Sequence, residues 1–213
     1  PMRFQVIINT IFLDIGMVLV GIDYEPTLTT LSNLNGLSVK EIIRRLENDS
    51  VIPDYEKGFL TTEEFFEQIT ILLDIDISLE RFEGIWTGTL VMDNQDSNDF
   101  IPSELFQQLK CNHRVIALSN TNEMQFDYLS KVYPLIREFD DYVLSHQVGH
   151  LKPDPEIYRR AIQQSGASPE ESLFVDDLVE NVKGAEQMGI RGLLFEGKGQ
   201  LRQDLEKLKI LCE

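Results

Sequence analysis

Four short segments of the chain carry polar side chains whose chemical types complement one another. Asp14 follows the apolar run IFL, and Ser119 follows VIAL. Lys152 lies in the proline-rich loop HLKPDP, and the adjacent pair Asp176 and Asp177 follows LFV. A carboxylate, a hydroxyl, an amine and a carboxylate pair are the groups that would bind a phosphoryl group together with Mg²⁺. We therefore take these residues as candidates for one phosphate and magnesium site.

Asp14 and Lys152 are the candidates for the chemical step. A carboxylate at a strand end can attack phosphorus and form an acyl-phosphate, which divides a difficult hydrolysis into two easier steps. An ammonium group in a rigid loop would neutralise the charge of the nucleophile and of the phosphate. The structural alternatives are an Asp14 that accepts hydrogen bonds from turn amides and a Lys152 that is solvated.

Ser119 and Asn120 are the candidates for phosphate binding, because they follow a strand and precede a helix. Their hydroxyl and side-chain amide, with the first N–H groups of the helix, would point at one phosphoryl oxygen. The alternative is that Ser119, Asn120 or Thr121 simply caps the helix.

The pair Asp176 and Asp177 is the candidate metal site, since two adjacent carboxylates repel each other unless a cation lies beside them. Mg²⁺ would relieve that repulsion, and Asn181, one turn into the next helix, could orient Lys152 or one of the carboxylates. A turn or cap role is the weaker reading.

These residues need a scaffold that brings strand ends together, and the second half of the chain predicts one. Strands alternate with helices there, which indicates an α/β fold with a Rossmann-like, doubly wound parallel sheet. The expected helices are 102–110, 123–131, 155–165, 179–188 and one from residue 200, and the expected strands are 114–118, 142–144, 172–175 and 192–195.

The strand that ends at Asp14 finds its parallel neighbours only beyond residue 112, so the intervening stretch should form an inserted domain. We expect a core of residues 1–22 and 97–213 and a helical cap of residues 23–96, with crossings at 20–26 and 93–99. The cap contains no convincing strand. Capping-box patterns and apolar periodicity predict its helices, at 26–34, after Ser38, after Thr61 and at 78–86, with Trp86, Phe82, Phe65 and Phe66 in its core. An insert at this place would lie above the strand ends and act as a lid.

Composition limits the kinds of partner. With 19 basic and 36 acidic residues the net charge is −17, which disfavours nucleic acid, and no apolar run approaches membrane-spanning length. Cys111 and Cys212 are isolated, so a disulfide framework and a zinc site are both unexpected and a cytoplasmic location fits. The three histidines have no metal-ligand spacing. We expect a small phosphorylated metabolite as partner, and the sequence is compatible with a monomer or a homodimer.

In motif order and over its whole length, the chain resembles the haloacid dehalogenase-like (HAD) superfamily. The strings LSNTNEMQFDYLSKVYPLIREFDDYVLSHQVGHLKPDPEIY and GASPEESLFVDDLVENVKGAEQMGI resemble subfamily IA. The nearest likeness is to the bacterial alpha-D-glucose-1-phosphate phosphatase group and the phosphatase domain of soluble epoxide hydrolase.

The resemblance implies an Mg²⁺-dependent enzyme with a helical cap and an aspartyl-phosphate intermediate. It implies that Asp14 is nucleophile and metal ligand, that the Gly16 carbonyl is a second ligand, and that Asp177 and Asp176 complete the protein ligands. It further implies that Ser119 and Asn120 bind the phosphoryl group and that Lys152 holds it against the nucleophile.

Gly16 departs from the family pattern, in which most phosphatases carry an aspartate that acts as general acid and base and contributes about 10²- to 10⁴-fold. The resemblance to the glucose-1-phosphate phosphatase group also implies glycine at this position, so an active site is still expected. Asp23 or Glu25 could supply the proton instead. The cap segment Lys57, Gly58 and Phe59 resembles the part of the cap that reaches the leaving group.

The sequence therefore predicts an Mg²⁺-dependent phosphatase for a small phosphorylated metabolite, plausibly a sugar phosphate. Two alternatives stay open: a metal-independent 2-haloacid dehalogenase, which the carboxylate pair disfavours, and a non-catalytic protein that binds phosphometabolites.

Overall fold

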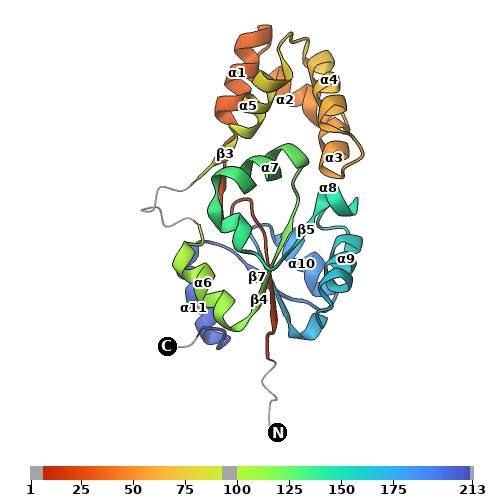
Figure 1. Cartoon of the computed structure of the whole chain (residues 1–213). Coiled ribbons are helices and arrows are strands. Elements are labelled where there is room, and N and C mark those ends of the chain that lie inside the picture. The colour runs from red at the N-terminus through yellow and green to blue at the C-terminus, as the bar shows by residue number, and fades with distance from the viewer. Residues whose placement is uncertain (1–6, 93–99, 212–213) are drawn as a thin grey trace.

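A five-stranded parallel sheet forms the centre of the protein in a computed structural model that describes residues 7–92 and 100–211 (Figure 1). The strand order is β5-β4-β1-β6-β7, so the first strand lies in the middle. The strands are β1 (Thr10–Leu13), β4 (Arg114–Ser119), β5 (Asp141–Leu144), β6 (Ser172–Asp176) and β7 (Arg191–Leu194). The apolar side chains of the three central strands, β4, β1 and β6, are buried on both faces, as expected for a parallel sheet covered by helices. The predicted α/β doubly wound fold is confirmed.

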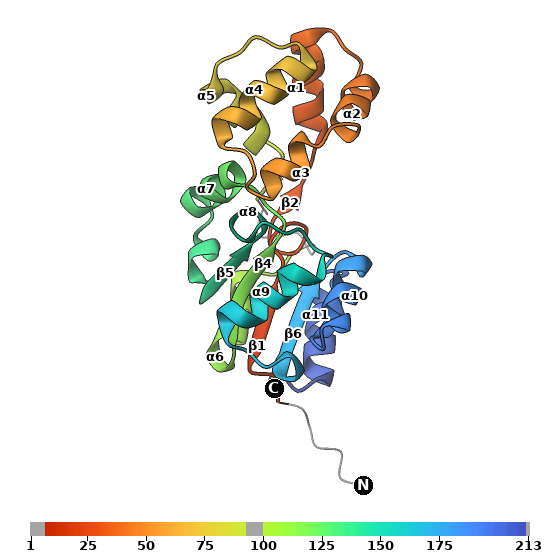
Figure 2. The same ribbon diagram turned by 90° about the vertical axis from the view of Figure 1, so that its right-hand side faces the viewer.

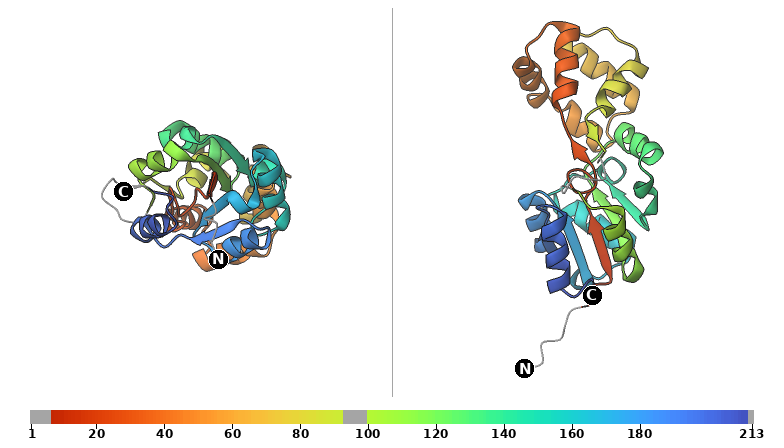
Figure 3. Two further views of the ribbon diagram at one scale, coloured as in Figure 1. Left: turned by 90° about the horizontal axis from the view of Figure 1, so that it is seen from below. Right: turned by 90° about the vertical axis from the view of Figure 1, so that its left-hand side faces the viewer.

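Side chains alternate between the two faces of the sheet, and each face has its own hydrophobic core. Ile11 and Leu13 pack on the face covered by α6 (Ser103–Asn112) and α11 (Lys198–Lys207), which Figure 3 shows in front of the sheet. Phe12 packs on the opposite face, covered by α9 (Pro155–Ser165) and α10 (Val179–Gln187). Figure 2 shows these two helices in front of the sheet.

The pairing of the strands brings the carboxyl-terminal ends of β1, β4 and β6 to one edge of the sheet, and the candidate residues lie there. Leu13 pairs with Ala117 of β4 and with Val175 of β6. Because all three strands run parallel, the residues that follow them leave the sheet at the same edge. Helix α7 (Glu123–Val132) and the short α8 (Ser145–Val148) begin beyond this edge, whereas the 3-10 helices η1 (Pro134–Glu138) and η2 (Pro169–Glu171) precede β5 and β6.

Five helices form a separate layer beyond that edge (Figure 1). They are α1 (Glu25–Asn35), α2 (Val39–Glu47), α3 (Val51–Glu56), α4 (Thr62–Leu73) and α5 (Leu79–Thr87). They share a core built on Phe65, Phe82 and Trp86, as predicted, with Phe66 packed against it. Thr61 forms the expected capping box with Glu64. One residue of α7, Met124, belongs to this same core and joins the two layers.

Two details of the cap differ from the sequence prediction. The expected strand-free insert contains β3 (Leu90–Val91), which pairs antiparallel with β2 (Gly21–Ile22). Two-residue strands are too short to show an alternating pattern. Helix α3 was not predicted because it contains Pro53, which a helix tolerates in its first turn. The crossing at 93–99 lies outside the described residues, so the division at residues 22/23 and 96/97 stays a prediction.

Every helix within residues 7–92 and 100–211 is too short or too polar to span a bilayer. The predicted cytoplasmic location stays a prediction.

Candidate active site

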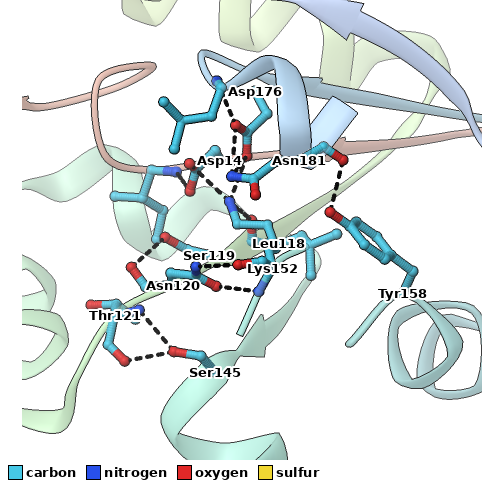
Figure 4. Close-up of polar contacts among 12 residues, drawn as sticks. Asp14, Leu118, Ser119, Asn120, Thr121, Ser145, Lys152, Tyr158, Asp176 and Asn181 are labelled. Carbon is cyan, nitrogen blue, oxygen red and sulfur yellow. Dashed lines mark hydrogen bonds and ion pairs between the residues drawn. The ribbon is translucent and has the colours of Figure 1, made fainter. Parts of the chain in front are cut away.

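The predicted chemical residues meet at the carboxyl-terminal edge of β1, β4 and β6 (Figure 4). Asp14 follows β1, Ser119 ends β4 and Asp176 ends β6. These three residues are 8%, 1% and 0% exposed, and Lys152 reaches them from its loop while only 4% exposed. Water is therefore largely excluded from a cluster of three charged groups.

Lys152 is the centre of the cluster. Its Nζ lies 2.8 Å from Asp14 Oδ2 and 2.6 Å from Asp176 Oδ2. It also donates a hydrogen bond of 3.1 Å to the carbonyl oxygen of Leu118. All three donors of the ammonium group are thereby used. The side chain is fixed between the two carboxylates.

Asn120 positions the loop that carries this lysine. Its Oδ1 accepts a 2.8 Å hydrogen bond from the Lys152 backbone N–H, and its Nδ2 donates one of 3.0 Å to the Lys152 carbonyl. The side-chain amide was expected to face the phosphoryl group, and this expectation is wrong. A role of Asn120 in phosphate binding would fall to its backbone N–H, and that role stays a prediction.

The helix cap after β4 is also a different residue from those considered. Asn122, rather than Ser119, Asn120 or Thr121, caps α7, because its Oδ1 accepts a hydrogen bond from Gln125 N. The Ser119 hydroxyl is therefore left free of that task. Its Oγ lies 3.5 Å from the Asn120 carbonyl oxygen, and the hydroxyl also lowers the pKa of Asp14.

Asp176 is held by its own neighbours. Asn181 Nδ2 donates to both of its carboxylate oxygens, at 3.0 and 3.2 Å, and Leu178 N donates to Oδ1 at 2.8 Å. Of the two roles considered for Asn181, the structure supports orienting an aspartate.

The pKa values of the site are shifted because several carboxylates are buried around a single ammonium group. Burial raises the pKa of Asp14 to about 7, against the lowering effect of Lys152 and in the same direction as the charge of Asp176. Burial lowers the pKa of Lys152, but the charges of Asp14 and Asp176 outweigh it and raise that pKa above its ordinary value. Burial and the Asp176 charge also raise the pKa of Asp177. The site thus carries more negative charge than Lys152 alone relieves.

A divalent cation fits this arrangement. Asp14, Asp176 and Asp177 each offer a carboxylate oxygen, and these oxygens lie within 4.8 Å of one another. Such oxygen ligands suit Mg²⁺. Gly16 lies in a tight turn, closed by a 2.7 Å hydrogen bond from Met17 N to Val20 O. That its carbonyl is a further ligand stays a prediction.

The predicted cap segment lies against the core at α8. A Cβ atom at Gly58, where φ is +70°, would lie 1.9 Å from the His146 carbonyl oxygen, so only glycine fits this contact. The Lys57 ammonium lies 5.9 Å from the ring centroid of Phe59, which is 63% exposed. Contact of this segment with a leaving group stays a prediction.

The two expected proton donors lie at the start of α1. Asp23 and Glu25 are exposed, and Asp23 Oδ1 accepts a hydrogen bond from Glu25 N. Asp23 therefore stabilises the first turn of the helix.

Sequence reasoning missed Ser145. This buried hydroxyl accepts a hydrogen bond from Thr121 N and donates one to Thr121 O, at 2.9 and 2.8 Å. It thereby braces the segment after β4. Its position directly after the apolar end of β5 is the same signal that identified Asp14 and Ser119.

Comparison with known proteins identifies the family. A model of the haloacid dehalogenase-like hydrolases matches residues 8–189, so the chain belongs to this family of enzymes and the predicted family is confirmed.

Three relatives illustrate the range of similarity. D-ribitol-5-phosphate phosphatase of Bacteroides thetaiotaomicron is 28% identical over 93% of this chain and 97% of that protein. A HAD family enzyme of the same bacterium, in complex with magnesium and inorganic phosphate, has a TM-score of 0.77 at 26% identity, covering 89% of this chain and 95% of that one. Bifunctional epoxide hydrolase 2 of Rattus norvegicus is 36% identical over 35% of this chain and 13% of that protein. The acidic cluster and the magnesium in the solved neighbour agree with the predicted cofactor.

Proposed function

We propose that the protein is an Mg²⁺-dependent phosphatase that hydrolyses a small phosphorylated metabolite, of the sugar or polyol phosphate class, through an aspartyl-phosphate on Asp14. The observation that carries the proposal is the buried Lys152 ammonium held between Asp14 and Asp176, with Asp177 completing a cluster of three carboxylates. The similarity to a D-ribitol-5-phosphate phosphatase supports the substrate class.

Each residue then has a defined task. One Asp14 oxygen attacks phosphorus, a new P–O bond forms, and the bond to the leaving alcohol breaks with its electron pair on the alcohol oxygen. Lys152 neutralises the nucleophile and a phosphoryl oxygen without reorganising, because its position is already fixed. Ser119 and the backbone N–H of Asn120 hold the phosphoryl oxygens. A bound Mg²⁺ would supply Lewis-acid stabilisation of the phosphoryl charge. A water then attacks phosphorus and releases phosphate, which regenerates Asp14.

The leaving alcohol must be protonated, and Gly16 has no side chain that could donate the proton. Asp23 and Glu25 are the candidates from the sequence, and their exposure disfavours them. Turnover of an alkyl phosphate that is unchanged in Asp23→Asn and Glu25→Gln proteins would remove both.

The test is a panel of sugar and polyol phosphates, including ribitol 5-phosphate, with p-nitrophenyl phosphate as an activated reference ester. We expect Mg²⁺-dependent phosphate release that stops with EDTA and falls about 1,000-fold or more in Asp14→Asn. An Asp14→Asn protein as active as wild type would refute the proposal. Halide release from a 2-haloacid in the presence of EDTA would favour the dehalogenase instead, which three clustered carboxylates disfavour.

A further inference from the structure

The segment that follows β4 has to present its backbone accurately, because in the proposed function the Asn120 N–H binds a phosphoryl oxygen beside the Ser119 hydroxyl. Residues 120–122 belong to no helix or strand. Their backbone directions are therefore not fixed by a regular hydrogen-bond ladder, and each residue keeps two soft dihedrals. Other contacts must hold the peptide planes of this segment.

Side-chain hydrogen bonds hold the segment in place. The Asn120 side chain bonds both the N–H and the carbonyl of Lys152. The Ser145 hydroxyl, directly after β5, bonds both backbone groups of Thr121 (Figure 4). It accepts from the Thr121 N–H at 2.9 Å and donates to the Thr121 carbonyl at 2.8 Å. These two groups belong to the peptide planes on either side of the Thr121 Cα, so one hydroxyl fixes both planes.

The Ser145 hydroxyl also decides which backbone N–H is available to a ligand. It occupies the Thr121 N–H, so this group cannot also donate to a phosphoryl oxygen. The neighbouring Asn120 N–H has no hydrogen-bond acceptor among residues 7–92 and 100–211. Of two consecutive N–H groups, the protein therefore uses one and leaves the other for an anion.

The contact between Ser145 and Thr121 is buried, because the two residues are 0% and 7% exposed. His146 Nδ1 also lies 3.2 Å from the Thr121 carbonyl, and it carries the proton there because a carbonyl oxygen only accepts. The Thr121 N–H, in contrast, has Ser145 as its one acceptor in the described part of the chain. Alanine at position 145 would leave this buried N–H unpaired, which costs free energy. The peptide between Asn120 and Thr121 would turn to find another partner, and the Asn120 N–H would lose its fixed direction.

We propose that Ser145 is a positioning residue, which through Thr121 holds the Asn120 N–H in the direction that a phosphoryl oxygen requires. Assigning this role to Ser145 rests on the proposed function. The hydroxyl acts through Thr121 and not by donating to the substrate, because its only proton is used by the Thr121 carbonyl. The Ser119 hydroxyl is placed independently, since Ser119 pairs with Leu144 in the sheet. Loss of the Ser145 hydroxyl should therefore weaken phosphate binding without abolishing it.

Ser145→Ala tests this role, with Ser172→Ala as the matched control. Ser172 is also 0% exposed and donates to the Ser168 carbonyl at 2.7 Å, but it begins β6 and so lies at the opposite edge of the sheet. We expect kcat/KM for p-nitrophenyl phosphate to fall about tenfold in Ser145→Ala, the equivalent of one hydrogen bond, and to stay within about twofold in Ser172→Ala. Both variants should unfold at a lower temperature than wild type, so stability alone does not separate them.

Calorimetric binding separates a positioning role from a structural one. With Mg²⁺ present, the Kd of inorganic phosphate should rise about tenfold in Ser145→Ala and stay within about twofold of wild type in Ser172→Ala. The Kd of Mg²⁺ alone should change little in either variant, because the three clustered carboxylates lie at the ends of β1 and β6. If Ser145→Ala binds phosphate as tightly as wild type, or if Ser172→Ala weakens binding equally, the positioning role is wrong while the phosphatase proposal stands.

A measurement on the wild-type protein decides the role even if Ser145→Ala does not fold. In amide NMR spectra, the Thr121 amide should exchange slowly with solvent without phosphate, because Ser145 already binds it. Inorganic phosphate with Mg²⁺ should then shift the Asn120 amide proton much more than that of Thr121. Fast exchange at Thr121, or equal shifts of both amides, would overturn the positioning role.

The same measurements distinguish failure of this role from failure of the proposed function. If phosphate binds with these signatures but wild type hydrolyses no ester, the phosphatase proposal fails and the role of Ser145 holds for anion binding. If wild type does not bind phosphate at all, both proposals are overturned.

Discussion

The edge of the sheet and the interior of the cap differ in how their polar groups are satisfied. At the sheet edge Lys152 uses all its donors on protein oxygens, and Asp176 accepts from Asn181 and Leu178. Within the described residues of the cap, the Trp86 N–H has no partner and Glu56 makes no hydrogen bond or ion pair. The polar groups of the first region are satisfied by the protein, and these two groups of the cap are not. The difference indicates that the groups of the proposed chemistry are preorganised in the core.

The largest loss of stability should come from removing the ammonium group of Lys152 at the sheet edge. Lys152→Met would leave Asp14 and Asp176 buried without a counter-charge, so we expect a loss of about 3–5 kcal/mol in the free energy of unfolding. Chemical denaturation in EDTA measures it without a bound cation that would compensate.

The matched control is Lys110→Met, which removes a partly exposed lysine that pairs with Asp140 at 2.7 Å. A partly exposed ion pair should contribute only about 1 kcal/mol or less to the free energy of unfolding. Equal losses in the two variants would show that Lys152 is not the electrostatic centre of the buried cluster.

The sequence predicted the first region far better than the second, for physical reasons. Buried parallel strands are continuous apolar runs, and a polar residue directly after each run must lie at the sheet edge, which placed Asp14, Ser119 and Asp176. Ser145 obeys the same rule and was overlooked. The side-chain direction of Asn120 depends on where a distant loop folds back, which no local pattern encodes.

The unsatisfied groups of the cap could not be predicted for a related reason. Trp86 was correctly predicted as part of the cap core, but whether its N–H finds a partner depends on helices far apart in the sequence. Glu56 lies one residue before the predicted segment Lys57–Phe59. Periodicity identifies which residues are buried, and it does not identify which buried groups stay unsatisfied.

A smaller change in stability should come from removing the unpaired carboxylate of Glu56. Because burial raises the folded-state pKa of Glu56 from 4.5 to about 7, its protonated form stabilises the fold fully below pH 4.5, and this contribution is lost as pH rises through 7. Glu56→Gln should therefore be more stable than wild type by about 1–2 kcal/mol at pH 8, after allowance for partial solvation, and nearly equal to it at pH 4.5. Thermal unfolding at both pH values measures the difference.

The control Glu67→Gln should differ from wild type by the same small amount at both pH values, because Glu67 is exposed. A Glu56→Gln difference that does not change with pH would contradict the view that an unsatisfied carboxylate costs stability here.

An effect of similar size is expected at the hydrogen bond that joins the cap to the core. The Tyr55 hydroxyl, on α3, accepts a 3.1 Å hydrogen bond from Met124 N at the start of α7 and lies 2.9 Å from Thr62 Oγ1. Tyr55→Phe keeps the ring stacked on Phe65 but leaves the Met124 N–H unpaired, so we expect a loss of about 1–2 kcal/mol. Because this bond joins cap and core, the first turn of α7 should also exchange its amide hydrogens faster.

Tyr128→Phe, on the same helix, is the matched control. The Tyr128 hydroxyl takes part in no hydrogen bond within the described residues, so its removal should leave both stability and exchange near wild type. If Tyr55→Phe leaves exchange at Met124 unchanged, this hydroxyl does not hold the cap closed. If exchange rises there while the KM for p-nitrophenyl phosphate is unchanged and the KM for a sugar phosphate increases, cap closure contributes to binding of the alcohol part of the substrate and not to binding of the phosphate.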